Sequence, residues 1–277
     1  MLRRRPKPKA LIAWSTGKDS AWSLHLARQA GELDVVGALT TTTEGYDRVS
    51  VHGVRNSILA AQIAAAGLRQ YRVEIPQVCT NATYEERMGA FIVQAKEAGI
   101  THCIFGDLFL EDVRAYRCRM LDGTGIAPVF PAWGIPTDRL ARQLIDGGVR
   151  THIVCIDTTK LDESFCGRQY THELVDSLPA DVDPCAERGE FHTLVSDGPM
   201  FRYPVPIVAT GSTRRDGQFM WTDFDLGQEE PPGLTGRAGR ERPVAHHPPR
   251  RGAAAPRPGE TTPGADGARA AGGVNEV

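Results

Sequence analysis

The sequence has no long apolar run, no excess of one charge and no closely spaced cysteine pair. No stretch of its 277 residues approaches the roughly 20 apolar residues that cross a bilayer. The basic start lacks the sustained apolar region of a signal peptide. Because 32 Lys+Arg face 34 Asp+Glu, no net field draws the chain to nucleic acid or an anionic membrane. We expect a cytoplasmic protein with neither a membrane nor a nucleic acid as its partner.

The six cysteines form no Cys-x-x-Cys motif. Without an export signal the expected state is free thiols, several of them in apolar strands, and the spacing disfavours a zinc or iron–sulfur site. Cys185 has no histidine at a spacing that indicates a nucleophile, so we interpret it as an inert thiol.

The composition changes near residue 226. From Gly227 onward there is no aromatic residue, and Gly, Pro, Ala and Arg dominate. Such a segment buries too little apolar surface to offset the entropy of ordering it. An Arg-rich nucleic-acid arm is the alternative, but acidic residues are mixed through it. We predict a disordered basic start over 1–8, a first domain over 9–127, a smaller α+β domain over 128–226 and a disordered tail over 227–277.

Apolar strands alternate with helical patterns before that tail. The predicted strands are Ala10–Trp14, Val35–Thr41, Tyr71–Ile75, His102–Phe105, Thr151–Ile156 and a proline-broken Tyr203–Ala209. The predicted helices are Ser20–Ala30, Gly53–Ala66, Thr83–Ala98, Pro136–Ile145 and one around Tyr170–Leu178. Strands separated by helices indicate βαβ units, and right-handed crossovers place helices on both faces of a parallel sheet. The expected fold class is α/β, a Rossmann-like parallel sheet followed by a smaller α+β domain.

The first predicted strand ends in Ser15-Thr16-Gly17-Lys18-Asp19-Ser20, where a helix starts at once. Ligands of open α/β sheets lie outside the carboxyl ends of the strands, and N–H groups at a helix start favour an anion. The two serines add donors, Gly17 permits close approach and Lys18 adds positive charge. Asp19 can cap the helix or orient a metal. This turn suits phosphate oxygens, although it lacks the Walker A pattern. The simpler alternative is a polar turn that caps a helix.

The residues S-T-G-K-D-S resemble the S-G-G-x-D-S loop of the PP-loop ATP pyrophosphatases, which have a Rossmann-like fold of the adenine nucleotide alpha hydrolase-like (HUP) type. The resemblance implies that ATP binds at 15–20 in the first domain and is cleaved between its α and β phosphates. A substrate carboxylate or carbonyl is adenylated in that reaction. Thr16 replaces the family's usual first glycine, and it would be strained if the backbone needs a positive φ.

Two later segments, C-I-F-G-D-L-F-L-E-D-V-R-A-Y-R and D-P-C-A-E-R-G-E-F-H-T-L-V-S-D-G-P-M-F, look similar to the diphthine–ammonia ligase branch of that superfamily. That branch has Gly-Asp after its fourth strand and, later, Cys-Gly-Glu-x-Gly-Glu-Tyr/Phe-x-Thr-Leu-Val-x-Asp-Gly-Pro. The resemblance spans residues 10 to about 201 and implies an AMP-forming ligase that transfers ammonia to an adenylated carboxylate. The acceptor would be diphthine on elongation factor 2 in an archaeon or eukaryote, and an unknown acid in a bacterium.

Gly106 and Asp107 would lie on the same rim as the loop at 15–20. Gly106 would make room for the nucleotide, and Asp107 would hold Mg²⁺ or position the adenylate; a tight turn with a surface aspartate is the alternative. Arg114 or Arg117 would reach a phosphate or a substrate carboxylate. A solvated, salt-bridged helix explains these arginines as well.

Glu190 would bind ammonium or accept its proton, with His192 as a possible partner, although the branch more often has Glu at that position. The alternative is a structural β-turn-β in which Glu190 pairs with an arginine. His52 resembles a histidine that borders the family's adenine pocket, and it could equally cap a helix. Trp14 and Trp22 are better explained as core residues than as base-stacking ones.

The predicted catalytic residues are Asp19, Asp107 and Glu190. The predicted ATP and Mg²⁺ residues are Ser15, Thr16, Gly17, Lys18, Asp19, Ser20, His52, Gly106 and Asp107. The predicted substrate residues are Arg114, Arg117, Glu187, Glu190, His192 and Thr193. Two other functions stay open: a tRNA-modifying PP-loop enzyme, which would need a basic surface or a cysteine relay, and a non-catalytic adenine-nucleotide-binding protein.

Overall fold

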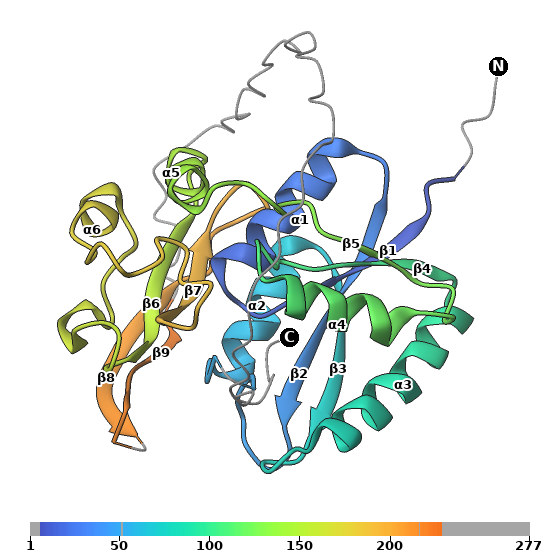
Figure 1. Ribbon diagram of the computed structural model, residues 1–277, viewed down its shortest axis with the longest axis horizontal. Helices are drawn as coiled ribbons and strands as arrows, with labels where there is room; N and C mark the ends of the chain where they lie inside the picture. The colour runs from blue at the N-terminus through green and yellow to red at the C-terminus, as the bar shows by residue number, and fades with distance from the viewer. Residues whose placement is uncertain (1–5, 51, 216, 229–277) are drawn as a thin grey trace, which may run out of the picture. The chain divides into compact units, whose positions relative to one another are not determined.

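A five-stranded parallel sheet forms the centre of the first half of the chain (Figure 1). The computed structural model describes residues 6–50, 52–215 and 217–228. The strand order is β3-β2-β1-β4-β5, so the order reverses between β1 and β4. The strands are β1 (Lys9–Ala13), β2 (Asp34–Thr43), β3 (Arg69–Ile75), β4 (Ile100–Ile104) and β5 (Ala127–Val129). The predicted α/β fold is confirmed, and only the short β5 was not anticipated in this sheet.

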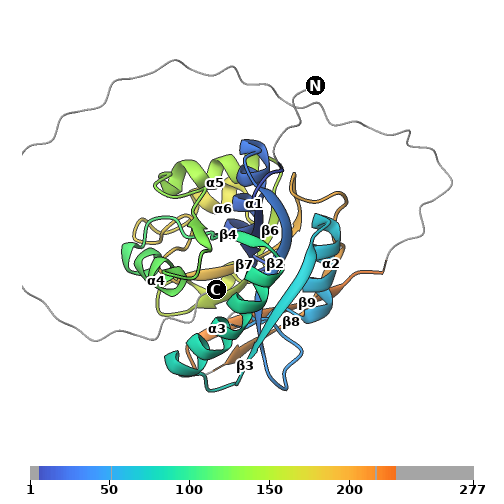
Figure 2. The ribbon, with the colours of Figure 1, turned by 90° about the vertical axis from the view of Figure 1, so that its right-hand side faces the viewer.

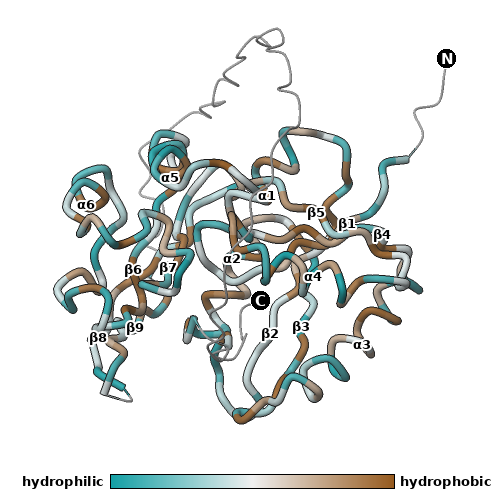
Figure 3. The backbone as a smooth tube through the Cα atoms, viewed as in Figure 1, coloured by the Kyte–Doolittle hydropathy of each residue, from teal (hydrophilic) through white to brown (hydrophobic). Residues whose placement is uncertain are grey.

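Helices cover both faces of the parallel sheet. They are α1 (Lys18–Ala30), α2 (Asn56–Ala66), α3 (Asn81–Glu97) and α4 (Glu111–Leu121). Side chains of β1 alternate between the faces: Ala10 and Ile12 join the core beneath α1 and α2, while Leu11 and Ala13 join the core beneath α3 and α4. Figure 3 shows apolar segments along these central strands. Trp14 and Trp22 lie in the core, as predicted.

A second, antiparallel sheet follows in the order β7-β6-β9-β8. It contains β6 (Arg150–Asp157), β7 (Phe191–Asp197), β8 (Ile207–Arg215) and β9 (Phe219–Leu226), and it is accompanied by α5 (Thr137–Asp146), the 3₁₀ turn η1 (Glu163–Phe165) and α6 (His172–Asp176). Its buried residues join the same core as α1 and α2, and β9 lies beside α2 (Figure 2). The smaller α+β region is therefore confirmed, and α1 and α2 lie between the two sheets.

Two local predictions for this second region were wrong in their bounds. The strand expected over 203–209 begins only at Ile207, because Pro204 and Pro206 lack the N–H that a ladder needs. It then continues to Arg215 and pairs with β9, which was not predicted. The helix expected around 170–178 is the single turn of α6. All six cysteines are free, as expected.

The predicted tail covers 227–277, and its residues 229–277 lie outside the described residues. Residues 1–5 of the predicted basic start lie outside them as well. The described residues belong to one compact unit. Within these ranges, none of the helices has the length and apolar content needed to traverse a bilayer.

Candidate functional site

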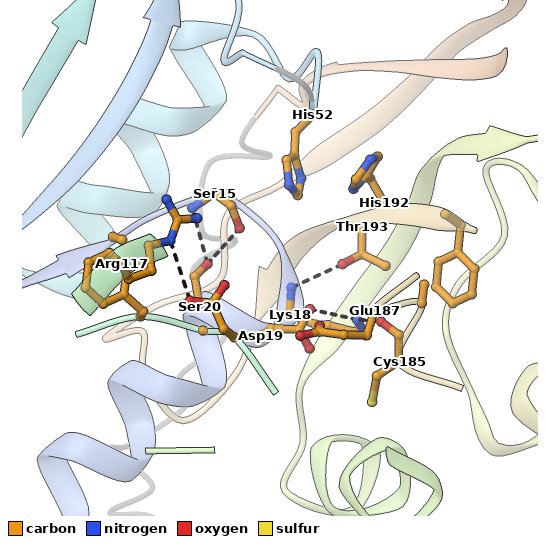
Figure 4. A pocket seen from close by; sticks show the side chains of 16 residues that line it. Ser15, Lys18, Asp19, Ser20, His52, Arg117, Cys185, Glu187, His192 and Thr193 are labelled. Carbon is orange, nitrogen blue, oxygen red and sulfur yellow. Dashed lines mark hydrogen bonds and ion pairs between the residues drawn. The ribbon is translucent and has the colours of Figure 1, made fainter. Parts of the chain in front are cut away.

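A pocket lies at the carboxyl ends of β1 and β4, where the strand order reverses (Figure 4). Ligands of open parallel sheets bind at this point because two neighbouring loops diverge there. The lining comes from the loop at 15–20, from 105–107 after β4, from α4, from His52 and from the segment 185–193. The pocket therefore lies at the edge of the first sheet, and the segment 185–193, which leads into the second sheet, forms one of its walls.

The loop after β1 is shaped by its own serines. The hydroxyls of Ser15 and Ser20 lie 3.1 Å apart, and Ser20 Oγ donates to the carbonyl of Gly17 at 3.1 Å. Gly17 caps α1 and itself lies outside the pocket lining. A Cβ there would lie 3.2 Å from both the His52 ring and the carbonyl oxygen of Thr193. Gly17 therefore lets β7 approach the start of α1.

Two non-glycine residues of the described chain have a positive φ, and both flank this pocket. Thr16 has φ 72° and Ala186 has φ 60°. Each stands where the resembled motifs carry glycine, so the strain that the sequence suggested for Thr16 is present. Such residues cost on the order of 1–3 kcal/mol and persist only where the surroundings hold them. Thr16 is fully buried and does not line the pocket.

Lys18 joins the loop to the second sheet. Its Nζ donates to Asp19 Oδ2 at 2.8 Å and to the carbonyl of Cys185, and its backbone N–H donates to Thr193 Oγ1 at 3.1 Å. Burial lowers the pKa of Lys18, but Asp19 and the acidic groups beyond it outweigh that effect, and the pKa is raised above its ordinary value. Lys18 thus stays charged although its side chain is almost fully buried.

Asp107 and Arg117 form the opposite side of the pocket. Arg117 Nε lies 3.6 Å from Asp107 Oδ2, and the Arg117 side chain is only 2% exposed. Burial raises the pKa of Asp107, against the opposing effect of Arg117. The alternative of a solvated helix does not hold for Arg117, which is buried beside the Phe105 ring, although most other residues of α4 are exposed or half-buried. Arg114 stacks on Trp133, 4.5 Å from the ring centre, and does not line the pocket.

The structure gives a different reason for a glycine at position 106 from the one that we expected. A Cβ there would lie 2.9 Å from the backbone nitrogen of Ser20 and 3.0 Å from the carbonyl carbon of Asp19. The end of β4 therefore packs directly on the start of α1, and only glycine permits this approach. Gly106 does line the pocket, but the space that a side chain would take belongs to the loop backbone.

The structure also changes the assignment of Glu190. Its side chain is 3% exposed and does not line the pocket. Both carboxylate oxygens accept backbone hydrogen bonds, from Asp183 N and from Arg188 N, at 3.0 Å each. Glu190 therefore holds the turn that precedes β7, and its ion-pair alternative with an arginine is wrong as well. The alternative of a structural β-turn-β corresponds to a turn followed by the single strand β7.

Glu187 is the carboxylate of this turn that faces the pocket. It accepts a hydrogen bond from Leu108 N at 2.7 Å. Burial, reinforced by the nearby Asp19, raises the pKa of Glu187 to about 8. The motif resemblance already included Glu187, but nothing in the sequence distinguished its role from that of Glu190.

Two histidines form the remaining wall. The rings of His52 and His192 lie 4.6 Å apart between centres, and Figure 4 shows them side by side above Thr193. Burial lowers the pKa of His192 to about 4 and that of His52 well below its ordinary value, so both rings are neutral at pH 7. His52 does not cap a helix, because α2 begins at Asn56 after an N-cap at Arg55.

The structure brings most predicted site residues to this pocket. Those that line it are Ser15, Lys18, Asp19, Ser20, His52, Gly106, Asp107, Arg117, Glu187, His192 and Thr193. Those outside its lining are Thr16, Gly17, Arg114 and Glu190. Sequence reasoning missed five further residues that line the pocket: Ala13, Phe105, Cys185, Ala186 and Phe191. None of them has a signal in the sequence beyond its place in a strand or motif.

The carboxylates present fit Mg²⁺ bound together with phosphate. Asp19 Oδ1 is buried and accepts no hydrogen bond from the described residues, while Asp107 Oδ2 has Arg117 Nε as its ion-pair partner at 3.6 Å. Mg²⁺ prefers oxygen ligands and is commonly held by one or two carboxylates plus substrate phosphates. In the described ranges, no cluster of three or more His, Cys, Asp or Glu side chains could hold a metal ion. The phosphate oxygens would have to complete the ligand set.

Residues 136–226 match the family model of the diphthamide synthase C-terminal domain. The matched stretch runs from α5 to β9 and contains the 185–193 wall of the pocket. It supports the resemblance to the diphthamide synthases within the PP-loop superfamily, and the loop at 15–20 lies outside it. A search of curated proteins found no match.

Proposed function

We propose that the chain is an ATP-dependent, AMP-forming carbon–nitrogen ligase of the diphthine–ammonia ligase type. One observation carries the proposal. The S-T-G-K-D-S loop and the segment that matches the diphthamide synthase domain meet in one pocket, joined by Lys18 N to Thr193 Oγ1 at 3.1 Å. A loop of the pyrophosphatase type beside a wall of the synthase type is what an adenylating amide ligase requires.

In this proposal the loop and the start of α1 hold the outer phosphates of ATP. The N–H groups of the first helical turn have no partners within the helix and attract an anion. Lys18 and Arg117 add positive charge at side chains that are almost fully buried, where each charge counts for more than in water. Asp19 and Asp107 would hold Mg²⁺, which neutralises charge on the leaving pyrophosphate when bound.

The chemistry has two steps. An oxygen of the substrate carboxylate attacks the α-phosphorus, the bond to the β-phosphate oxygen breaks, and pyrophosphate leaves with the electron pair. Ammonia nitrogen then bonds to the acyl carbon, the bond to the AMP oxygen breaks, and the amide and AMP result. The attacking nitrogen loses one proton in the second step.

Glu187 accepts that proton in our proposal, in place of the Glu190 expected from the sequence. Glu187 faces the pocket with one oxygen on Leu108 N, while both oxygens of Glu190 are occupied by backbone amides. A base is most effective when its pKa lies near the working pH, and burial raises that of Glu187 to about 8. The neutral His52 and His192 rings leave this part of the pocket without an additional positive charge that would repel ammonium.

The test is product analysis with the full chain, ATP, Mg²⁺, ammonium and a panel of carboxylic acids that includes diphthine on elongation factor 2. Equal amounts of AMP, pyrophosphate and amide are expected with the correct acid, and much less with Ser20→Ala. ADP and orthophosphate as products would contradict the proposal. ATP binding without any product would favour a non-catalytic nucleotide-binding protein. A shift of tRNA in a gel, together with tRNA-dependent pyrophosphate release, would favour a tRNA-modifying enzyme.

A further inference from the structure

Gln62, in the middle of α2, connects three elements through one buried amide. Its side chain is fully buried. Its Nε2 donates to the carbonyl of Thr16 at 3.1 Å and to the carbonyl of Val195 at 2.6 Å. Its Oε1 accepts from Trp14 Nε1 at 3.0 Å. The loop after β1, the strand β7 and the end of β1 therefore meet at a residue that lies outside the pocket lining.

These partners fix the orientation of the amide. An indole N–H can only donate, so the amide oxygen must face Trp14, and the NH₂ group must face the two carbonyls. Both donors of the amide are then used, each on a carbonyl from a different sheet region. A buried polar side chain whose groups are all paired makes a specific connection, because any other side chain leaves at least one partner unpaired.

Thr16 needs such a connection. Its φ of 72° is unfavourable for a β-branched residue, and its buried Oγ1 has no hydrogen-bond partner among the described residues. The conformation is therefore held through the Thr16 carbonyl, which accepts from Gln62 Nε2 and from Val195 N at 3.0 Å. Gln62 also binds the Val195 carbonyl, so Gln62, Thr16 and Val195 form a closed hydrogen-bonded ring.

We propose that Gln62 is a positioning residue that holds Thr16 in its left-handed conformation and so aims the phosphate-binding loop at the pocket. The next residues of the loop are Gly17 and Lys18, and Lys18 in turn binds Thr193 and Cys185. A rotation at Thr16 would move the N–H groups of the first helical turn. The inference rests on the proposed function to the extent that the ligand of the loop is a phosphate.

The first test compares Gln62→Met with the wild-type full chain in calorimetric titrations with Mg²⁺ and inorganic pyrophosphate. We expect the Kd for pyrophosphate to rise by about 10-fold or more, because small displacements of positioning groups are costly. The matched control is Thr151→Val, which removes a buried hydrogen bond to the carbonyl of Leu194, the neighbour of Val195. That variant should lose thermal stability and keep its Kd within about 2-fold, because its effect is confined to the strand pair β6–β7.

The second test separates positioning from stability. Glycine adopts a positive φ freely, so in a Thr16→Gly background the loop should keep its shape without Gln62. There the loss caused by Gln62→Met should fall to about 3-fold or less, which is a measurable coupling between residues in contact. If Gln62→Met alone does not fold, Gln62→Glu replaces it, because the buried carboxyl is protonated, still accepts from Trp14 and can donate to only one of the two carbonyls.

The outcomes are distinct. A wild-type protein that binds neither pyrophosphate nor ATP would overturn the proposed function and this inference together. Wild-type binding with an unchanged Kd in Gln62→Met would overturn the inference alone. Equal losses in the wild-type and Thr16→Gly backgrounds would also overturn it, because Gln62 would then act on stability without acting through Thr16.

Discussion

The two walls of the pocket are built by different means. The loop at 15–20 connects a strand and a helix that adjoin in the chain, and distant residues of the described ranges add hydrogen bonds only to the Thr16 carbonyl and to Lys18. The turn at 183–190 has no such support and is held by two carboxylates. Asp183 accepts from Cys185 N at 2.9 Å, and Glu190 accepts from Asp183 N and Arg188 N. The comparison shows that Asp183 and Glu190 accept hydrogen bonds from backbone N–H groups of the turn, and that Glu187 is the carboxylate that faces the pocket.

The largest expected effect is a loss of amide formation in a Glu187 variant, which distinguishes the role of Glu187 from that of Glu190. Glu187→Gln should slow amide formation by about 10²–10⁴-fold, the usual contribution of a general base, while ATP-dependent adenylation continues. Release of pyrophosphate and formation of amide are measured in the same reaction. Hydroxylamine should restore product formation, because its conjugate acid is far more acidic than ammonium and its neutral form needs no such base. An unchanged rate with ammonium would remove Glu187 from the mechanism.

Glu190→Ala should instead destabilise the protein. It would leave the buried N–H of Asp183 and the partly buried N–H of Arg188 without their partner, at a cost of about 1–3 kcal/mol for a buried group. Urea denaturation should show a loss of about 3 kcal/mol in the free energy of unfolding. If Glu190→Ala kept its stability and lost only amide formation, the two glutamates would have exchanged roles relative to our proposal.

Two arginines on α4 allow a residue that lines the pocket and one outside its lining to be compared in ATP binding. Arg117 lines the pocket, and Arg114 stacks on Trp133 outside it. Arg117→Lys keeps the charge but loses the planar guanidinium, and we expect ATP to bind about 10-fold more weakly. Arg114→Lys should bind ATP as the wild type does. Titration calorimetry of the two variants decides between them, and equal losses would show that α4 acts only as a unit.

The pH dependence of stability provides a further check. The pKa of Glu187 rises from an ordinary 4.5 to about 8 in the folded state. Below pH 4.5 this carboxyl is protonated in both the folded and unfolded states and carries no burial penalty. As the pH rises from 4.5 to about 8, the unfolded state releases this proton and the folded state keeps it, so the free energy of unfolding falls across this window. Melting curves should therefore show a smaller decline over this window in Glu187→Gln than in the wild type, and identical declines would contradict the assignment.

The smallest effects test the strain on the two walls. Thr16→Gly and Ala186→Gly should each stabilise the chain by up to about 1 kcal/mol, because both positions have a positive φ. The matched control is Ala90→Gly in the exposed middle of α3, which should cost about 1 kcal/mol. Thermal melts compare the three variants. Destabilisation by all three would mean that neither Thr16 nor Ala186 is strained.

The local pattern of the sequence predicted the parallel sheet well, because each strand and the helix that follows it are neighbours in the chain. Gly31 and Gly67 end α1 and α2 in the left-handed conformation, as their positions indicated. The second sheet was less predictable. β5 has only three residues, and β8 and β9 owe their pairing to each other more than to an apolar pattern.

The amino-acid sequence by itself determined where the S-T-G-K-D-S loop lies, which strand precedes it and which motif resembles a synthase, because these depend on residues close together in the chain. Only the tertiary structure decided which glutamate faces the pocket, which arginine is buried, and that Gln62 connects Thr16, 46 residues away, with Val195, 133 residues away. The physical reason is that a buried polar group is defined by its hydrogen-bond partners, and here those partners come from distant elements.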